Sequence, residues 1–462
     1  MQESGQYKRV FRFIGSALIF VYEVGVFAYL WYSIYQFSME ELFWHRGNWA
    51  VVGLYAMILF FLMRTYGGFS IGLMRLSESF LSHILTIICA NFVGYFEIAM
   101  LTITYHKVMP FLMITLAECL FSCVLVYIFQ KIYERLYPPH RLLVIYGEYS
   151  PDAMVAKMKQ RSEHYKVDGL VHISVGMERL SEMIGDYEGV VLCDLPAQER
   201  NDLLKLCFDR SVRTYVTPKI SDILFSGMDD IYMFDTPLYL ARNQGLQPVD
   251  RMAKRIFDVI FSMLCIVIAS PIMLLIAVAI KIGDGGPVFY TQTRLTVHAR
   301  PFQIIKFRTM RIDAEKDGAR LAARDDERIT TVGRFLRASH LDELPQLFNV
   351  FIGDMSMVGP RPERPEIFEE YEKSIPEFAF RLKVRAGLTG FAQVYGQYNT
   401  TPYDKLKLDM TYIQQFSLVM DLKILFLTGR ILFVREKTEG VDKDQTTSLP
   451  QEASSKQEET SV

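Results

Sequence analysis

Two adjacent carboxylates, Asp342 and Glu343, stand directly before Leu344-Pro345 in the C-terminal half of the chain. Proline is tolerated in the first turn of a helix because the amides there have no intrahelical partner. Pro345 therefore predicts a helix that begins near Asp342 and continues through QLFNVF (346–351). The positive end of that helix would favour ionised carboxylates and a nearby anionic ligand. One carboxylate can then attack a phosphorus atom while the other holds a divalent metal.

Three cationic residues surround this pair in the sequence. Arg337 lies five residues upstream of Asp342, Arg361 lies in the stiff Gly-Pro-Arg-Pro stretch at 359–362, and Lys306 lies on the predicted strand FQIIKFRTM (302–310). The planar guanidinium group suits bidentate binding of phosphate. Any one of these cations is more simply explained as a solvated surface group or a structural ion pair. The whole set near a fixed carboxylate pair instead predicts a site that handles phosphate groups.

Long apolar segments precede this region, in a chain whose residues are 50% hydrophobic. Each has about the 20 residues that a bilayer-spanning helix needs. Lys and Arg gather before the first segment, between the second and third, and after the fourth, which predicts four membrane spans with both ends at the cytoplasmic face. Glu23, Glu97 and Glu118 fall inside these segments, where they are expected to face a bundle interior or a partner. The segments lie at 13–37, 49–66, 79–104 and 108–130.

Charge and cysteine usage exclude two broad classes of protein. Lys+Arg number 50 and Asp+Glu 52, for a formal net charge of −2, so no dominant nucleic-acid-binding surface is expected. The 6 cysteines include no CxxC pair, and no structural zinc site is expected from them or from the 8 histidines. The cysteines are expected to be packing residues.

Residues 137–248 alternate between short apolar runs and helical stretches, a pattern typical of a small parallel sheet with a Rossmann-like arrangement. The first turn between strand and helix, Gly147 to Pro151, lacks the GxGxxG spacing that lets the backbone approach a pyrophosphate. A regulatory or assembly role is therefore expected rather than dinucleotide binding. The expected strands lie at 142–147, 168–174, 189–196 and 213–218.

A fifth apolar run at 256–282 is interrupted at its middle by Ser270-Pro271 and follows two basic residues, Lys254 and Arg255. Proline removes a helical hydrogen bond and clashes with the preceding turn. These features predict a helix-break-helix that enters the membrane and returns to the cytoplasmic face, with Ser270 bonded to a freed carbonyl. Lys254 is expected to pair with Asp258. An ordinary kinked transmembrane helix is the alternative.

The C-terminal part returns to helical periodicity. Residues 421–437 carry the apolar clusters 424–427 and 431–434, which fit an amphipathic surface helix or, equally, core packing. The expected organisation has five parts. They are four transmembrane helices (1–136), a degenerate Rossmann-like domain (137–248), a re-entrant membrane helix (249–283), a catalytic domain (284–437) and a disordered tail (438–462).

From Lys254 to about Glu439 the sequence resembles the bacterial sugar transferase family, and more closely its polyprenyl-phosphate hexose-1-phosphate transferases. The preceding segments resemble the long, multi-domain branch of that family. The resemblance rests on Lys254-Arg255…Asp258, Ser270-Pro271, GPVFY, KFRTM, LDELPQLFNV…GDMSMVGPRP and GLTGFAQV.

The resemblance implies a mixed membrane protein with a monotopic α/β catalytic domain on the cytoplasmic face of the bacterial inner membrane. Asp342 would attack a UDP-sugar, release UMP and form a phosphosugar-aspartate, which undecaprenyl phosphate would resolve to start polysaccharide repeat-unit synthesis. Glu343 would hold Mg²⁺, and Arg337 and Arg361 would bind phosphates with Lys306 as a helper. An unmodified hexose, glucose or galactose, is the favoured donor sugar. The oligomeric state stays open, with a homodimer as one option.

One motif departs from the family pattern RxGxxGKxF, because residues 294–302 contain no glycine. The hairpin there is expected to turn differently, and His298 and Arg300 are given no role. Two other classes of function compete with transfer. In one, the chain is an assembly or regulatory protein with an inactive C-terminal domain, which the intact acidic and basic residues oppose. In the other it is a nucleotide-sugar oxidoreductase that binds NAD(P), which the missing glycine pattern opposes.

Overall fold

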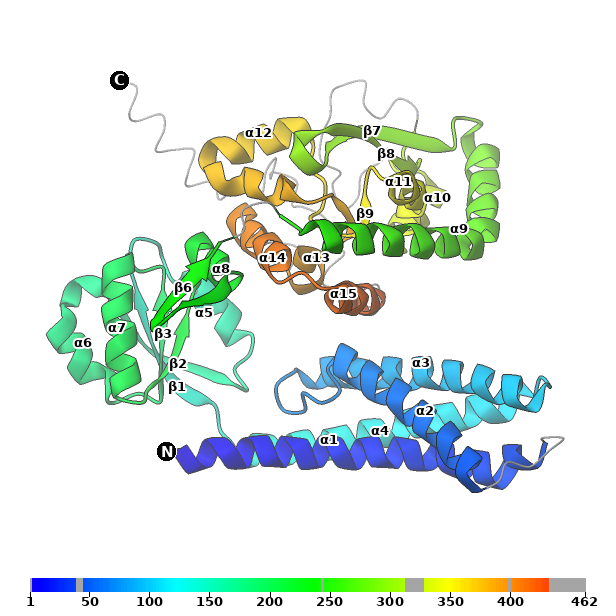
Figure 1. Ribbon diagram of the computed structural model, residues 1–462, viewed down its shortest axis with the longest axis horizontal. Coiled ribbons are helices and arrows are strands. Elements are labelled where there is room, and N and C mark those ends of the chain that lie inside the picture. Colours follow the sequence, from blue (N-terminus) through cyan, green and yellow to red (C-terminus); the bar gives the residue numbers. More distant parts are fainter. Residues whose placement is uncertain (1, 39–44, 242–244, 312–327, 397–399, 432–462) are drawn as a thin grey trace. The chain divides into compact units, whose positions relative to one another are not determined.

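The computed structural model describes residues 2–38, 45–241, 245–311, 328–396 and 400–431 (Figure 1). The chain divides into two compact units, Met1–Pro218 and Lys219–Val462. The expected disordered tail lies outside the described residues. The finer division of the chain into five parts stays a prediction.

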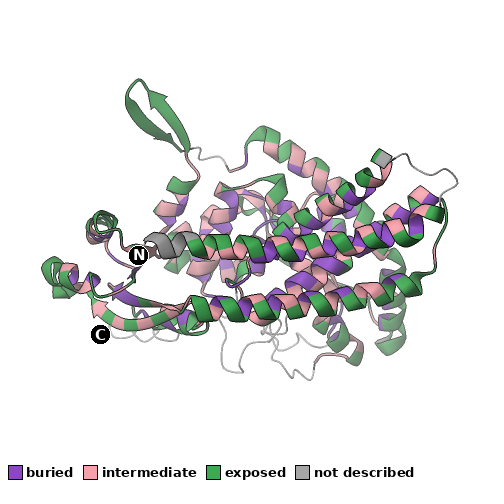
Figure 2. Cartoon of the chain, turned by 90° about the horizontal axis from the view of Figure 1, so that it is seen from below, coloured by how far each residue is buried: buried purple, intermediate pink, exposed green. Residues whose placement is uncertain are grey.

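Long apolar helices open the first unit, where the sequence predicts spans. In the described part of the chain they are long and apolar enough to cross a membrane, and exposed residues recur along them (Figure 2). Two buried acidic residues lie between them: Ser122 donates to Glu23 (3.1 Å) and Asn91 donates to Glu118 (2.7 Å). These two carboxylates thus lie inside the helical bundle. The helices are α1 (Gln2–Leu30), α2 (His45–Tyr66), α3 (Leu76–Thr102) and α4 (Val108–Leu136).

The rest of the first unit is a parallel four-stranded sheet in the order β2-β1-β3-β4. Residues of α6 and α7 form one hydrophobic core with one face of the sheet, and residues of α5 form another with the other face. The parallel α/β arrangement is confirmed. The elements are β1 (His140–Tyr146), α5 (Asp152–Lys159), β2 (Tyr165–His172), α6 (Met177–Ile184), β3 (Gly189–Cys193), α7 (Ala197–Asp209) and β4 (Arg213–Val216).

Gly147, after β1, has a packing role. A Cβ at this position would lie 2.6 Å from the carbonyl oxygen of Asp194, so the backbone approach at the end of β3 requires glycine. The glycine in this turn therefore has an explanation that involves no nucleotide.

The second unit contains two antiparallel hairpins, β5–β6 and β7–β8, and a short parallel pair, β9–β10. Helices surround the last two pairs (Figure 1). The elements are α8 (Ile220–Ser226), β5 (Asp229–Met233), β6 (Thr236–Leu240), α9 (Pro248–Asp284), β7 (Phe289–Leu295), β8 (Pro301–Phe307), α10 (Thr331–Ala338), α11 (Gln346–Ile352), β9 (Ser356–Val358), α12 (Pro365–Ser374), β10 (Gly387–Thr389), α13 (Phe391–Tyr395), α14 (Pro402–Gln414) and α15 (Leu418–Ile431).

Helix α9 contains the Ser270-Pro271 pair and is bent rather than broken. The helix continues through Pro271 to Asp284, and its two limbs run in clearly different directions in Figure 1. The Ser270 hydroxyl donates to the carbonyl of Val267 at 2.8 Å. That carbonyl lies four residues before Pro271, so it is the one that the proline leaves without an amide partner. The predicted bond is confirmed, and it lets the helix bend without a break.

The predicted Lys254–Asp258 pair is wrong. Lys254 instead pairs with Asp421 of α15 at 2.5 Å, while Asp258 accepts a hydrogen bond from the Met357 amide at 3.0 Å. Both carboxylates are buried. A backbone amide already stabilises Asp258, whereas the buried charge of Asp421 is compensated by Lys254. Ile424 is also buried, so the described part of α15 packs into the core. The second apolar cluster of this helix lies largely outside the described residues.

Candidate active site

The carboxylate pair lies in a 3₁₀ turn, Leu341–Glu343, that leads into α11. The sequence predicts an α-helix from Asp342 onward, but the α-helix begins later, at Gln346. Pro345 explains the difference, because it has no amide with which to donate to the carbonyl four residues earlier. The pair therefore precedes α11 by one turn.

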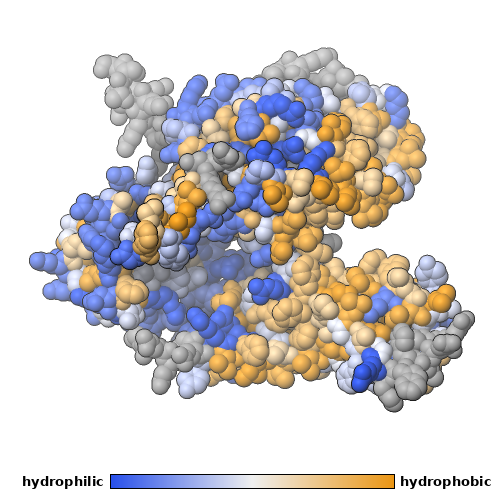
Figure 3. All heavy atoms as spheres, in the orientation of Figure 1, coloured by the Kyte–Doolittle hydropathy of each residue, from blue (hydrophilic) through white to orange (hydrophobic). Residues whose placement is uncertain are grey.

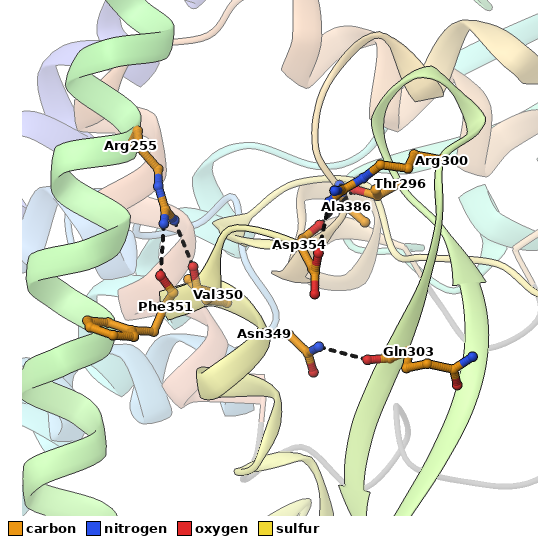
Figure 4. A network of polar contacts seen from close by, with 9 residues as sticks. All are labelled: Arg255, Thr296, Arg300, Gln303, Asn349, Val350, Phe351, Asp354 and Ala386. Carbon is orange, nitrogen blue, oxygen red and sulfur yellow. Dashed lines mark hydrogen bonds and ion pairs between the residues drawn. The ribbon is translucent and has the colours of Figure 1, made fainter.

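Helix α11 is fixed from two sides (Figure 4). Arg255 of α9 donates to the carbonyls of Val350 and Phe351, both at 2.8 Å, and so satisfies the C-terminal end of the helix. The buried Asn349 side chain donates to the Gln303 carbonyl at 2.8 Å. Its carbonyl oxygen also accepts from the amide of Ile305, on β8, at 3.0 Å. These bonds set the position of the turn that carries Asp342 and Glu343.

The turn between β7 and β8 contains no glycine and places two other residues in a strained conformation. His298 (φ 56°) and Ala299 (φ 55°) both adopt the left-handed conformation, which non-glycine residues rarely take. Two bonds to Asp354, just after α11, hold the turn: Arg300 pairs with its carboxylate at 2.8 Å, and Thr296 donates to its carbonyl at 2.9 Å (Figure 4). Arg300 thus has a structural role in this turn.

Two of the three predicted cations meet at one oxygen of Glu343. Lys306 Nζ donates to Glu343 Oε1 at 2.7 Å, and an Arg361 amino group donates to the same oxygen at 2.9 Å. Burial alone would raise the pKa of Glu343, but Arg361 and Lys306 hold it far below its usual range. Glu343 is therefore ionised at any physiological pH.

Asp342 has different surroundings, although it is the adjacent residue. It accepts no hydrogen bond from another described residue. Burial raises the pKa of Asp342, and the negative charge of Glu343 raises it further. The positive charges of Lys306 and Arg337 lower this pKa and so oppose the shift. Arg337 is held in place by a 2.9 Å bond from its Nε to Thr309 Oγ1. The environment thus separates the pKa values of the two carboxylates, which is a common arrangement where adjacent groups have different roles in a reaction.

The loop that carries Arg361 is held by a residue that the sequence reasoning missed. Arg381, only 3% exposed, donates to the backbone carbonyl of Arg361 at 3.0 Å and pairs with the buried Asp409 at 2.7 Å. It also lies 3.5 Å from Glu363. No local pattern links Arg381 to an acidic residue 28 positions later. The one sequence feature that indicates burial of Arg381 is that it lies among the apolar residues of 378–384.

The donor set fits a magnesium ion that is shared with a substrate. Among the described residues, no group of three or more His, Cys, Asp or Glu side chains is placed to hold a metal, which opposes a dedicated protein cage. Magnesium instead tends to take one or two carboxylates, substrate phosphates and waters. Glu343 Oε2 receives neither of the two cation bonds, and Asp342 is adjacent. Glu343 Oε2 can therefore supply an oxygen ligand of the type that this ion prefers.

Together, the apolar helices and the carboxylate–cation site define a membrane protein whose α/β domain is suited to binding phosphate groups. The chain belongs to the bacterial sugar transferase family, whose model matches residues 249–435. This match covers all but the first residue of α9, both predicted catalytic carboxylates and the whole of α15.

Individual relatives extend this result. A UDP-N-acetylgalactosamine-undecaprenyl-phosphate N-acetylgalactosaminephosphotransferase of Aeromonas hydrophila is 32% identical over 316 residues, which are 68% of this chain and 71% of that relative. A UDP-glucose:undecaprenyl-phosphate glucose-1-phosphate transferase of Caulobacter vibrioides is 44% identical over 39% of this chain and 71% of that relative. A protein of the same name from Klebsiella pneumoniae is 38% identical over 44% of this chain, but the match spans only 43% of that relative's length.

Proposed function

We propose that this chain transfers a hexose 1-phosphate from a UDP-sugar to undecaprenyl phosphate through a phosphosugar-aspartate intermediate. The observation that carries the proposal is the pair of adjacent carboxylates with opposite surroundings: Glu343 bonded to two cations, and Asp342 without a hydrogen bond from another described residue. The names of the relatives support the donor and acceptor classes.

In the first step, a carboxylate oxygen of Asp342 attacks the phosphorus that bears the sugar. The bond from this phosphorus to the bridging oxygen breaks, and UMP leaves with the electron pair. Burial raises the pKa of Asp342, and a more basic carboxylate is a stronger nucleophile once it is ionised. Arg361 and Lys306 lie where they can exchange Glu343 for phosphate oxygens and stabilise the charge that spreads over them.

In the second step, a phosphate oxygen of undecaprenyl phosphate attacks the same phosphorus. The bond to Asp342 breaks, the carboxylate is regenerated, and undecaprenyl-diphospho-sugar is released. Glu343 would hold Mg²⁺, which would supply neutralising charge at the diphosphate. Arg337, fixed by Thr309, stays beside Asp342 in both steps and opposes the build-up of negative charge there.

The contacts of α9 support its re-entrant placement. Its first limb contacts α11 through Arg255, and Ile276 and Ile280 of its second limb share a hydrophobic core with Phe307 and Leu336. Both limbs therefore bind the same α/β body. A helix that crossed the bilayer would have its ends about 30 Å apart, on opposite sides of the membrane.

The surface of α9 agrees with insertion in the membrane. Around its bend the helix exposes large apolar side chains, among them Val267 and Ile268 (66% and 67% exposed), and Figure 3 shows hydrophobic residues gathered over this helix. We therefore place α9 in the cytoplasmic leaflet, the catalytic domain on the cytoplasmic face and α1 to α4 across the membrane.

The activity is tested with full-length protein in detergent, Mg²⁺ and undecaprenyl phosphate, with UDP-glucose, UDP-galactose and UDP-N-acetylgalactosamine as donors. UMP release identifies the donor, and without the lipid acceptor the intact mass should increase by one hexose phosphate on Asp342. Asp342→Asn should abolish both signals, whereas Asp202→Asn, at an exposed surface pair, should change neither. UMP release that persists in Asp342→Asn would exclude this nucleophile. Inactivity with a wide panel of UDP-sugars would favour an inactive scaffold.

The placement of α9 is tested separately by cysteine labelling. Single cysteines are introduced at positions 250 and 283, in the first and last turns of the helix. The protein's own cysteines are replaced by serine. A membrane-impermeant maleimide should label both from the cytoplasmic side of inverted vesicles and neither from the periplasmic side of spheroplasts. Labelling of the two positions from opposite sides would show that α9 crosses the membrane.

A further inference from the structure

Three strands of the sheet in the first unit begin with a polar residue. Strands β1, β2 and β4 begin at His140, Tyr165 and Arg213, and because the strands are parallel these residues lie at the same, amino-terminal edge. Dinucleotide sites of doubly wound folds lie at the opposite, carboxyl edge. Any ligand bound here would thus not use the nucleotide site of that fold.

A cavity of about 450 Å³ opens at this edge. The first residues of the three strands line it, together with residues from the start of α1 and the end of α4. This volume is within the roughly 300–1,000 Å³ typical of small-molecule sites. Four cationic residues and four tyrosines dominate the lining, namely Lys8, Arg9, Arg12, Arg213, Tyr133, Tyr137, Tyr165 and Tyr215.

The charge of this cavity is strongly one-sided. Of its lining residues only Glu163 carries a carboxylate against four cations. In the described part of the chain, none of Lys8, Arg9, Arg12 and Arg213 forms a salt bridge. Like charges held together without counter-ions repel one another. An anion bound between them would relieve that repulsion.

The cavity also has directed donors and a polar atom without a partner. Lys8 Nζ and His140 Nε2 are 2.9 Å apart, and the other ring nitrogen of His140 is 2.7 Å from Glu188. The ammonium of Lys8 lies 5.3 Å from the ring centre of Tyr137. His164, a lining residue, has a buried Nε2 that hydrogen-bonds to no other described residue. This ring nitrogen therefore adds a polar atom without a described partner to the lining.

We propose that this cavity binds a phosphate-bearing anion. A doubly charged phosphate group suits the four cations, and the tyrosine rings suit an apolar or aromatic part attached to it. The phosphate can come from two sources. One is the headgroup of an anionic lipid, because the cavity lies at the ends of two apolar helices; the other is a soluble nucleotide. The site uses none of the residues proposed for transfer, and its occupancy is measured without turnover.

Pyridoxal 5′-phosphate is a suitable probe because it carries a phosphate and an aldehyde that forms an imine with lysine. Full-length protein is treated with this probe or with pyridoxal, which lacks the phosphate, and the imine is fixed with borohydride. Mass spectrometry then compares Lys8 with the surface residue Lys205, which is 79% exposed. We expect the phosphate to increase labelling of Lys8 at least ten-fold and labelling of Lys205 much less.

Two variants and two competitors complete the test. Arg213→Gln should reduce the phosphate-dependent labelling of Lys8 at least five-fold, whereas Arg179→Gln, on the exposed surface of α6, should not change it; a thermal melt verifies that both fold. Protection by UMP in neutral detergent would identify a soluble source. Protection only in nanodiscs that contain phosphatidylglycerol, against phosphatidylcholine alone, would identify a lipid source. Equal labelling of Lys8 by the two probes, an unaffected Arg213→Gln, or no protection by either anion would overturn the proposal.

Discussion

Arg381→Met removes a guanidinium group that holds the loop carrying Arg361, and its effect on stability follows from burial. Arg381 and Asp409 are 3% and 1% exposed, and burial raises the pKa of Asp409 even with Arg381 beside it. Without the arginine, the carboxylate has to stay buried and uncompensated or take up a proton. Loss of one partner of such a pair costs about 3–5 kcal/mol. We expect the guanidinium-induced unfolding of the second unit, followed by circular dichroism in detergent, to shift by this amount.

The same substitution affects activity through a second route. The bond from Arg381 to the Arg361 carbonyl (3.0 Å) fixes the backbone behind the guanidinium that we propose binds phosphate. Without this bond the loop is free to move. If Arg361 then loses contact with the phosphate, the transition state loses a charged hydrogen bond of about 1.5–3 kcal/mol. At about 1.4 kcal/mol per factor of ten, kcat/KM should fall roughly 10- to 150-fold. Because the loop is proposed to bind the donor phosphate, KM for the UDP-sugar should rise.

A double variant separates these two effects. Arg381→Met with Asp409→Leu replaces the buried pair by apolar groups, which is often neutral for stability, so it should recover most of the lost unfolding free energy. The bond to the Arg361 carbonyl is still missing, and kcat/KM should therefore stay low. Arg179→Met is the matched control on an exposed surface. Recovery of full kcat/KM in the double variant would refute the positioning role, and an unfolding change below about 1 kcal/mol in Arg381→Met would refute the burial argument.

Three further predictions concern other contacts. Asp342 has to be ionised to attack, and its pKa is raised above the usual value of 3.8 for an aspartate. The loss of kcat/KM toward acidic pH should therefore have its midpoint above 3.8. Glu343→Gln should move this limb to lower pH, because Glu343 raises that pKa; an unmoved limb would assign it to another group. Thr309→Val, which removes the acceptor of Arg337, should lower kcat/KM about 3- to 10-fold, equal to about 0.5–1.5 kcal/mol, with an unchanged melting temperature. Lys254→Met should destabilise the second unit by about 3–5 kcal/mol in the same unfolding assay because Asp421 stays buried, and a milder effect would mean that Asp421 is protonated.

The parallel sheet of the first unit could be predicted from the sequence because its signal is local. Residues 142–145 are a continuous apolar run, so the strand they form is apolar on both faces. Such a run is typical of a parallel strand that is covered on both sides. The pairing of Lys254 could not be predicted in the same way. Sequence spacing offers Asp258, four residues away, whereas the real partner Asp421 lies 167 positions away. Long-range burial decides such pairs, and local periodicity carries no information about it.

The same limit applies to the candidate site. Residue types and spacing predicted that Lys306, Arg361 and the carboxylate pair belong together, and the structure brings both cations to Glu343. Which of the two carboxylates receives the cations depends on where β8 and the 360–363 loop lie in space. The supporting residues Arg381 and Asn349 were missed for the same reason. Their roles consist of bonds to the backbone of distant segments, which no motif records.

The different surroundings of Asp342 and Glu343 also explain why α11 is held so firmly. Adjacent residues of a 3₁₀ turn point about 120° apart, so a rotation of the turn before α11 by about this angle would point Asp342 toward Lys306 and give it the ion pair that now belongs to Glu343. Arg255 and Asn349 oppose that rotation by bonds to α9 and β8. The network around α11 therefore does more than stabilise the fold. It keeps one carboxylate bound to cations and the other open to attack phosphorus, and the proposed two-step transfer requires that difference.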